Sequence, residues 1–201
     1  MYKLHQIILP VLVLLFSLKP SIAQEIDFGT FSSSYTMSVA TTNGTTLDFG
    51  QLISGDVNPV TIALDDFETI IVGITGVKYL DVFVQITAPD YIIKDDEPGC
   101  VTDNCRVPFT LSAAYANKGM ENSNQAVIMT VLSNTASAQF PIKYRGNAPP
   151  GPPPTPVYEG YNPSLYEETA YIYVYGSLAA GTYDAGSYSS LTDISVMVSY
   201  D

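Results

Sequence analysis

The strongest constraint on the fold is the two-residue alternation of apolar and polar side chains along much of the chain. Leu80, Val82, Val84 and Ile86 alternate with residues that are mostly polar, Phe83 being the exception. Successive side chains of a β-strand point to opposite faces, so this pattern predicts a strand with one apolar face. Further strands are predicted at 35–40, 46–49, 60–64, 69–74, 107–113, 126–132, 140–144, 169–175 and 193–200.

Turn residues separate these segments, among them Asn43-Gly44, Pro98-Gly99 and Ala185-Gly186. No window of twelve residues after the first 23 has the 3.6-residue period of a helix. Many short strands without intervening helices predict an all-β fold with two antiparallel sheets packed face to face. We therefore expect an immunoglobulin-like β-sandwich, with a barrel as the alternative.

The N-terminus has the pattern of a secretory signal peptide. Lys3 precedes an apolar run from Ile7 to Phe16, and the small residues Ser21 and Ala23 provide a cleavage site. The run is about half as long as the roughly 20 residues that a membrane helix needs, and no later segment is apolar for long enough. We expect residues 1–23 to be removed and residues 24–201 to form a single secreted domain in the periplasm, at the cell surface or outside the cell.

Charge and histidine content exclude several functions. All 20 acidic residues follow residue 23, whereas Lys3 and Lys19 leave with the signal, so six basic residues remain and the formal charge is −14. Such a chain repels nucleic acid. The single histidine, His5, is also removed, so no Ser-His-Asp or Cys-His site can form. We predict no enzymatic activity; hydrolysis by carboxylate pairs such as Asp65-Asp66 remains the alternative.

A proline-rich insertion interrupts the strands at 145–168. Six prolines lie between 149 and 156, and proline cannot donate a hydrogen bond to a sheet. The segment is predicted to be a long surface loop, either a spacer or a recognition loop that presents Tyr158 and Tyr161.

Cys100 and Cys105 are separated by four residues in a chain that we expect to be exported. A structural disulfide follows, because a redox motif would have two intervening residues and a zinc site would need more ligands. The surrounding carboxylates form a solvated loop or a calcium site, the only cofactor considered. They are Asp95, Asp96, Glu97 and Asp103.

Three tyrosines, Tyr171, Tyr173 and Tyr175, alternate with Ile172 and Val174. On a strand, the three rings stand on one face at intervals of about 6.6 to 6.8 Å. The row is a candidate ligand face for stacking on sugars, or else it covers part of the sheet.

The C-terminal segment has the most specific pattern. The block Gly181-Thr-Tyr-Asp-Ala-Gly-Ser-Tyr188 leads to an alternating strand whose apolar face carries Ile194, Val196, Val198 and the penultimate Tyr200. This ending, with Leu47-Asp48-Phe49-Gly50-Gln51-Leu52 and Val60-Thr61-Ile62, resembles the spore coat U and DUF4402-type secreted domains and the chaperone-usher pilin-like subunits. The resemblance implies an immunoglobulin-like subunit completed by β-strand addition from a partner's extended segment.

The resemblance makes Ile26 and Phe28, the apolar residues of the segment before the first strand, candidate donor positions, and makes Ile194, Val196, Val198 and Tyr200 candidate acceptors. We expect a non-enzymatic structural or adhesive surface protein that works by strand pairing and surface contact, and whose partners are other envelope proteins or further copies of the chain. The alternative is a carbohydrate- or ligand-binding β-sandwich module.

Overall fold

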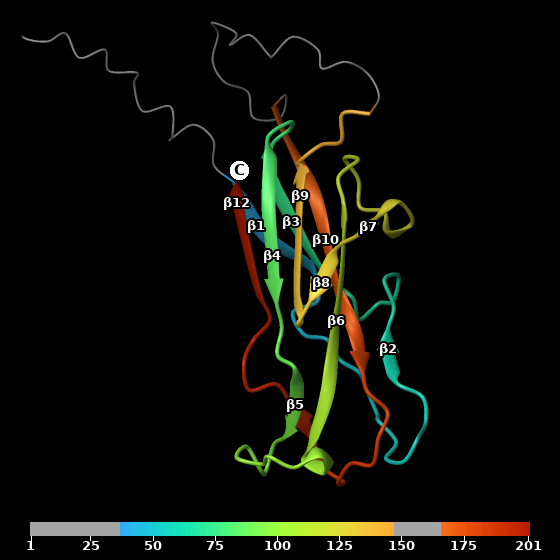
Figure 1. The fold of residues 1–201 in the computed structure, drawn as a ribbon. Coiled ribbons are helices and arrows are strands. Elements are labelled where there is room, and N and C mark those ends of the chain that lie inside the picture. Colours follow the sequence, from blue (N-terminus) through green and yellow to red (C-terminus); the bar gives the residue numbers. More distant parts are fainter. Residues whose placement is uncertain (1–36, 147–165) are drawn as a thin grey trace, which may run out of the picture. The chain divides into compact units, whose positions relative to one another are not determined.

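The computed structural model describes residues 37–146 and 166–201, which form an antiparallel β-sandwich (Figure 1). The signal peptide predicted at 1–23, the candidate residues Ile26 and Phe28, and most of the loop predicted at 145–168 lie outside the described residues. Two short 3-10 helices, η2 (Asp103–Cys105) and η3 (Ser123–Gln125), lie between the strands. No helix formed by the described residues is long and apolar enough to span a membrane.

The larger sheet, called the first sheet below, has the strand order β1-β3-β10-β6-β5-β11, with β2 beside β10 and β7 beside β6. Its strands are β1 (Ser38–Asn43), β2 (Val60–Ile62), β3 (Ile70–Val77), β5 (Tyr91–Lys94), β6 (Arg106–Ala116), β7 (Val127–Ile128), β10 (Glu167–Leu178) and β11 (Tyr188–Ser189). The second sheet has the order β12-β4-β9-β8. Its strands are β4 (Asp81–Thr87), β8 (Thr130–Leu132), β9 (Thr135–Pro141) and β12 (Ser195–Tyr200).

The core lies between the two sheets and follows the alternation seen in the sequence. Val82, Val84 and Ile86 of β4 are fully buried, as the sequence predicts, and Phe83 points to the outer face. They pack against the inner rows of β3, β6 and β10, which include Ile74. Each large aliphatic side chain buried in this way contributes about 1.5 to 3 kcal/mol.

One side of the sandwich is closed by a chain segment that crosses between the sheets. Val127 and Ile128 pair with β6, the Met129 amide donates to the Ala113 carbonyl at 2.9 Å, and Thr130–Leu132 then pairs with β9. Ser133 and Asn134, both with positive φ, make the two-residue hairpin from β8 to β9. This side of the sandwich therefore has a continuous backbone connection between the sheets.

The opposite side, between β1 and β12, is open. The register pairs Val39 of β1 with Ile74 of β3, so both side chains lie on the inner face of the first sheet. Ile74 is fully buried, whereas Val39 is 45% exposed. Among the described residues, the second sheet ends at β12, and no strand of it covers Val39 on the inner face of β1.

Four strand predictions are wrong in place or extent. Residues 46–49 form no strand; Leu47 and Phe49 instead pack on the core from a loop, and the Phe49 ring meets Phe109 edge to face at 5.9 Å. The strand predicted at 140–144 runs instead over Thr135–Pro141, and the one predicted at 35–40 is β1 at Ser38–Asn43. The segment predicted as one strand at 126–132 is two strands because it changes sheets.

Candidate functional site

The candidate site is the free edge of β12, the last strand. Among the described residues, β12 pairs with β4 alone, from Ser195 opposite Thr87 to Tyr200 opposite Val82. The Asp201 amide donates to the Asp81 carbonyl at 3.1 Å, which fixes the direction of the backbone groups. In an antiparallel ladder these directions alternate, so the amides and carbonyls of Val196, Val198 and Tyr200 point away from β4. They form the row that an additional strand would pair with.

The side chains of β12 divide between two environments. Ile194, Val196, Val198 and Tyr200, the residues singled out in the sequence, are half-buried and contact the core. Met197 lies on the outer face and is 59% exposed. The strand is therefore anchored by its inner face, and its outer edge carries no partner among the described residues.

Tyr200 ties this strand to the opposite sheet. The Val77 amide of β3 donates to the Tyr200 hydroxyl at 3.0 Å, and the neighbouring residue, Gly76, makes room for it. A Cβ atom on Gly76 would lie 2.4 Å from the hydroxyl oxygen. The penultimate tyrosine thus needs a glycine on β3, and an isolated glycine within a strand pattern is the sequence signal for such a close approach.

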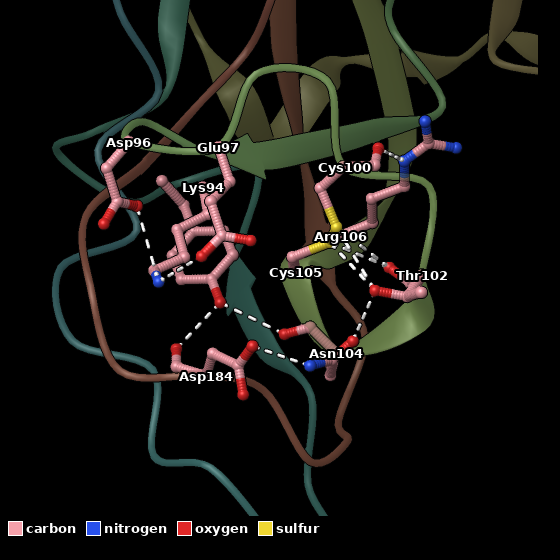
Figure 2. Close-up of a disulfide and its surroundings, with 10 residues drawn as sticks. Lys94, Asp96, Glu97, Cys100, Thr102, Asn104, Cys105, Arg106 and Asp184 are labelled. Carbon is pink, nitrogen blue, oxygen red and sulfur yellow. Dashed lines mark hydrogen bonds and ion pairs between the residues drawn. A yellow bond between two sulfur atoms is a disulfide. The ribbon is translucent and has the colours of Figure 1, made fainter.

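The disulfide between Cys100 and Cys105 is present, as predicted, with a Cα–Cα distance of 6.3 Å. It closes a small loop whose ends are held in place, because Arg106 Nε donates to the Cys100 carbonyl at 2.8 Å. Thr102 Oγ1 donates to Asn104 Oδ1 at 2.6 Å inside the loop (Figure 2).

This disulfide loop contacts the segment that leads to β12. Asn104 Nδ2 donates to the Asp184 carboxylate at 2.6 Å, and the Asp184 amide donates back to the Asn104 carbonyl at 2.8 Å (Figure 2). The Tyr188 hydroxyl donates to the Asp184 carbonyl at 2.7 Å, and partial burial raises its pKa. The block of residues 181–188 is thereby fixed before the chain enters β12, and sequence reasoning missed this contact because it joins residues 80 positions apart.

Three acidic residues near the disulfide form ion pairs or hydrogen bonds with other residues of the protein. Lys94 Nζ lies 2.9 Å from Glu97 and 3.4 Å from Asp96, and the hydrogen bond to Glu97 is the main reason that the pKa of Lys94 is raised. Asp95 accepts a hydrogen bond from Ser189 Oγ at 2.6 Å. Of the carboxylates considered above as calcium ligands, Asp95 thus helps to hold β5 beside β11, whereas Asp96 and Glu97 pair with Lys94 at the end of β5.

The tyrosine row of β10 stands on the outer face of the first sheet. Tyr173 is only 2% exposed and packs with Ala114 and Ala116, while Tyr171 and Tyr175 beside it are half-buried. Burial raises the pKa of Tyr173 and the nearby backbone of Asn122 lowers it, while the hydroxyl makes no hydrogen bond of standard geometry with the described residues. A ligand on this face would find two partly accessible rings, those of Tyr171 and Tyr175, with the buried Tyr173 between them.

Comparison of the chain with protein families, with curated proteins and with solved structures found no match. The geometry of the described residues is therefore the basis for the functional argument.

Proposed function

We propose that this protein is a secreted, non-enzymatic structural or adhesive surface protein with an immunoglobulin-like sandwich that assembles by β-strand addition at β12. The observation that carries the proposal is the free edge of this strand on the open side of the sandwich. Strand addition uses main-chain hydrogen bonds for affinity and alternate side-chain pockets for register.

The open side offers an added strand two surfaces at once. Its backbone would pair with the outward amides and carbonyls of Val196, Val198 and Tyr200. Its inward side chains would lie over the inner face of β1, where Val39 is exposed although it belongs to an otherwise buried row. Apolar residues at every second position of the incoming strand would thus complete the core.

The segment that we propose as donor is residues 24–34, with Ile26 and Phe28 as its apolar positions. They are two residues apart, which is the spacing that one face of a strand requires. A disulfide and a predicted signal peptide are compatible with export to an oxidising compartment.

The proposal is tested by measuring the molar mass of residues 24–201, purified from an oxidising compartment, by light scattering after size exclusion over a range of concentrations. We expect discrete multimers that survive dilution and disappear when residues 24–34 are deleted. A monomer at every concentration would contradict self-assembly.

A proline variant tests the edge itself. Val198→Pro removes an amide that points away from β4, so the existing ladder keeps its hydrogen bonds while the acceptor row loses one. The matched control is Val131→Pro on β8, the other edge of the same sheet; its amide points away from β9 because the two-residue hairpin pairs Leu132 with Thr135. We expect Val198→Pro alone to abolish the multimers; equal behaviour of the two variants would refute the role of β12.

A further inference from the structure

A pocket of about 570 Å³ is lined by residues at the ends of β6 and β9, by the segments that follow these two strands, and by Asp81 at the start of β4. Its walls are fixed by backbone contacts between the segments that follow these two strands. The Tyr144 amide donates to the Asn117 carbonyl at 2.7 Å, and Asn117 Nδ2 donates to the Pro141 carbonyl at 2.9 Å. The volume is within the range of about 300 to 1,000 Å³ that is usual for small-molecule sites.

The pocket combines an aromatic floor with polar walls. Tyr115 and Phe140 stack with their centroids 4.0 Å apart and their planes at 4°, and Phe140 is buried beneath the half-buried Tyr115. Tyr144 adds a second ring that is 51% exposed. Gln125 is exposed at the wall, and its side-chain amide makes no hydrogen bond with the described residues.

Two cations at the pocket are held by aromatic rings and not by carboxylates. Lys118 Nζ lies 6.0 Å from the centroid of Tyr144, and the Arg145 guanidinium lies 5.3 Å from the centroid of Tyr79 while donating to its carbonyl at 2.6 Å. Neither forms a salt bridge within 37–146 and 166–201, whereas Lys94 and Lys143 do. Both cations are therefore available to a carboxylate of a ligand.

We infer that this pocket binds an acidic sugar, a pyranose ring that carries a carboxylate. The negative faces of the aromatic rings attract the polarised C–H groups of a sugar ring, and the Gln125 amide can both donate to and accept from its hydroxyls. Lys118 and Arg145 supply the charge-assisted hydrogen bonds that a carboxylate needs.

The two cations select the class of sugar. Lys118 and Arg145 line the pocket together with the Asp81 carboxylate, and the Asp201 carboxylate accepts a hydrogen bond from the lining residue Gln139. Neither cation forms a salt bridge with these carboxylates, so both can bind the carboxylate of a ligand. A second hollow of about 280 Å³, by contrast, is lined by the carboxylates of Asp48, Asp66 and Glu68 and by no cation.

The test is an NMR titration of ¹⁵N-labelled residues 24–201, disulfide intact, with galacturonate and glucuronate at constant ionic strength. Galactose and glucose are the neutral counterparts, and acetate is the bare carboxylate. We expect concentration-dependent shifts centred on Lys118, Gln125 and Tyr144 with the uronates, and affinity lower by about tenfold with each comparison compound, which corresponds to about 1.4 kcal/mol.

Variants assign the binding to the pocket. Arg145→Gln and Tyr144→Ala are expected to weaken uronate binding by about tenfold or more. Lys94→Gln removes the same unit of charge outside the pocket and should leave the affinity unchanged. Absence of shifts with the uronates, equal affinity for neutral sugars, or an equal loss in Lys94→Gln would overturn the assignment. Because the readout is binding by one chain, it does not depend on whether copies assemble.

Discussion

The contact between Tyr200 and Gly76 offers a direct test of how the last strand is held. Tyr200→Phe removes the oxygen that accepts the Val77 amide, and Gly76→Ala places a methyl group 2.4 Å from where that oxygen lies. Both changes act on the same few atoms, so their effects on the free energy of unfolding should be coupled.

The magnitudes follow from the geometry. Tyr200→Phe should cost about 1 kcal/mol, because a partly buried amide loses its acceptor. Gly76→Ala should cost about 2 to 3 kcal/mol, because the tyrosine ring must move and its hydrogen bond is lost. In the Tyr200→Phe background the nearest ring carbon is 3.3 Å from the new methyl group, so the clash is small. Replacing glycine by alanine also lowers the conformational entropy of the unfolded chain, which stabilises the fold by about 0.4 to 1 kcal/mol. Gly76→Ala should therefore be nearly neutral in this background.

The assay is urea unfolding of the two single variants, the double variant and the parent, followed by circular dichroism. We expect a coupling energy of about 2 to 3 kcal/mol, with the double variant more stable than Gly76→Ala alone. The corresponding difference in Tm is about 2 to 4 °C per kcal/mol for a domain of this size. Additive effects within about 0.5 kcal/mol would show that the hydroxyl and the glycine do not share this contact.

Three further predictions concern other parts of the sandwich. Replacing Cys100 and Cys105 by alanine should lower the free energy of unfolding by about 2 kcal/mol, the value expected from loop-closure entropy for so short a ring, as measured by the urea midpoint. The hydrogen bond from Lys143 lowers the pKa of Glu168, so this carboxylate stabilises the fold at pH values above its ordinary pKa near 4.5. The stabilisation is lost as the pH falls through the lowered pKa. In thermal melts from pH 6 down to about pH 3, the Tm of Glu168→Gln should therefore fall less steeply than that of the parent. Phe49→Ala should cost about 1 to 3 kcal/mol in urea unfolding, because its ring packs on the core although it lies in a loop.

The strands with strong alternation were predictable from the sequence, and those without it were not. β4 and the first half of β6 were identified because most of their inner positions carry large apolar residues, such as Val84 and Ile86 on β4 and Phe109 and Leu111 on β6. β9 was placed too late because its inner positions include two alanines, Ala136 and Ala138, which give a weak hydrophobic signal before Phe140. The predicted strand at 46–49 was wrong because burial of Leu47 and Phe49 needs no sheet hydrogen bonds.

The candidate site was predictable in its residues and not in its surroundings. The pattern of Ile194, Val196, Val198 and Tyr200 identifies an amphipathic strand, and the neighbouring β4 was also expected. The position of this strand at an edge, and the exposed inner face of β1 in the opposite sheet, depend on which strands pair. The periodicity of a strand reports the environment of its two faces and carries no information on its two edges.

The sequence by itself determined the all-β class, the apolar rows of the core and the disulfide, because side-chain alternation and cysteine spacing are local properties. The tertiary structure decided which side of the sandwich is closed, where Tyr200 is anchored and where Lys118 and Arg145 meet an aromatic pocket. These features join residues far apart in the chain, and their positions follow from strand order and register, which nearest-neighbour patterns do not specify.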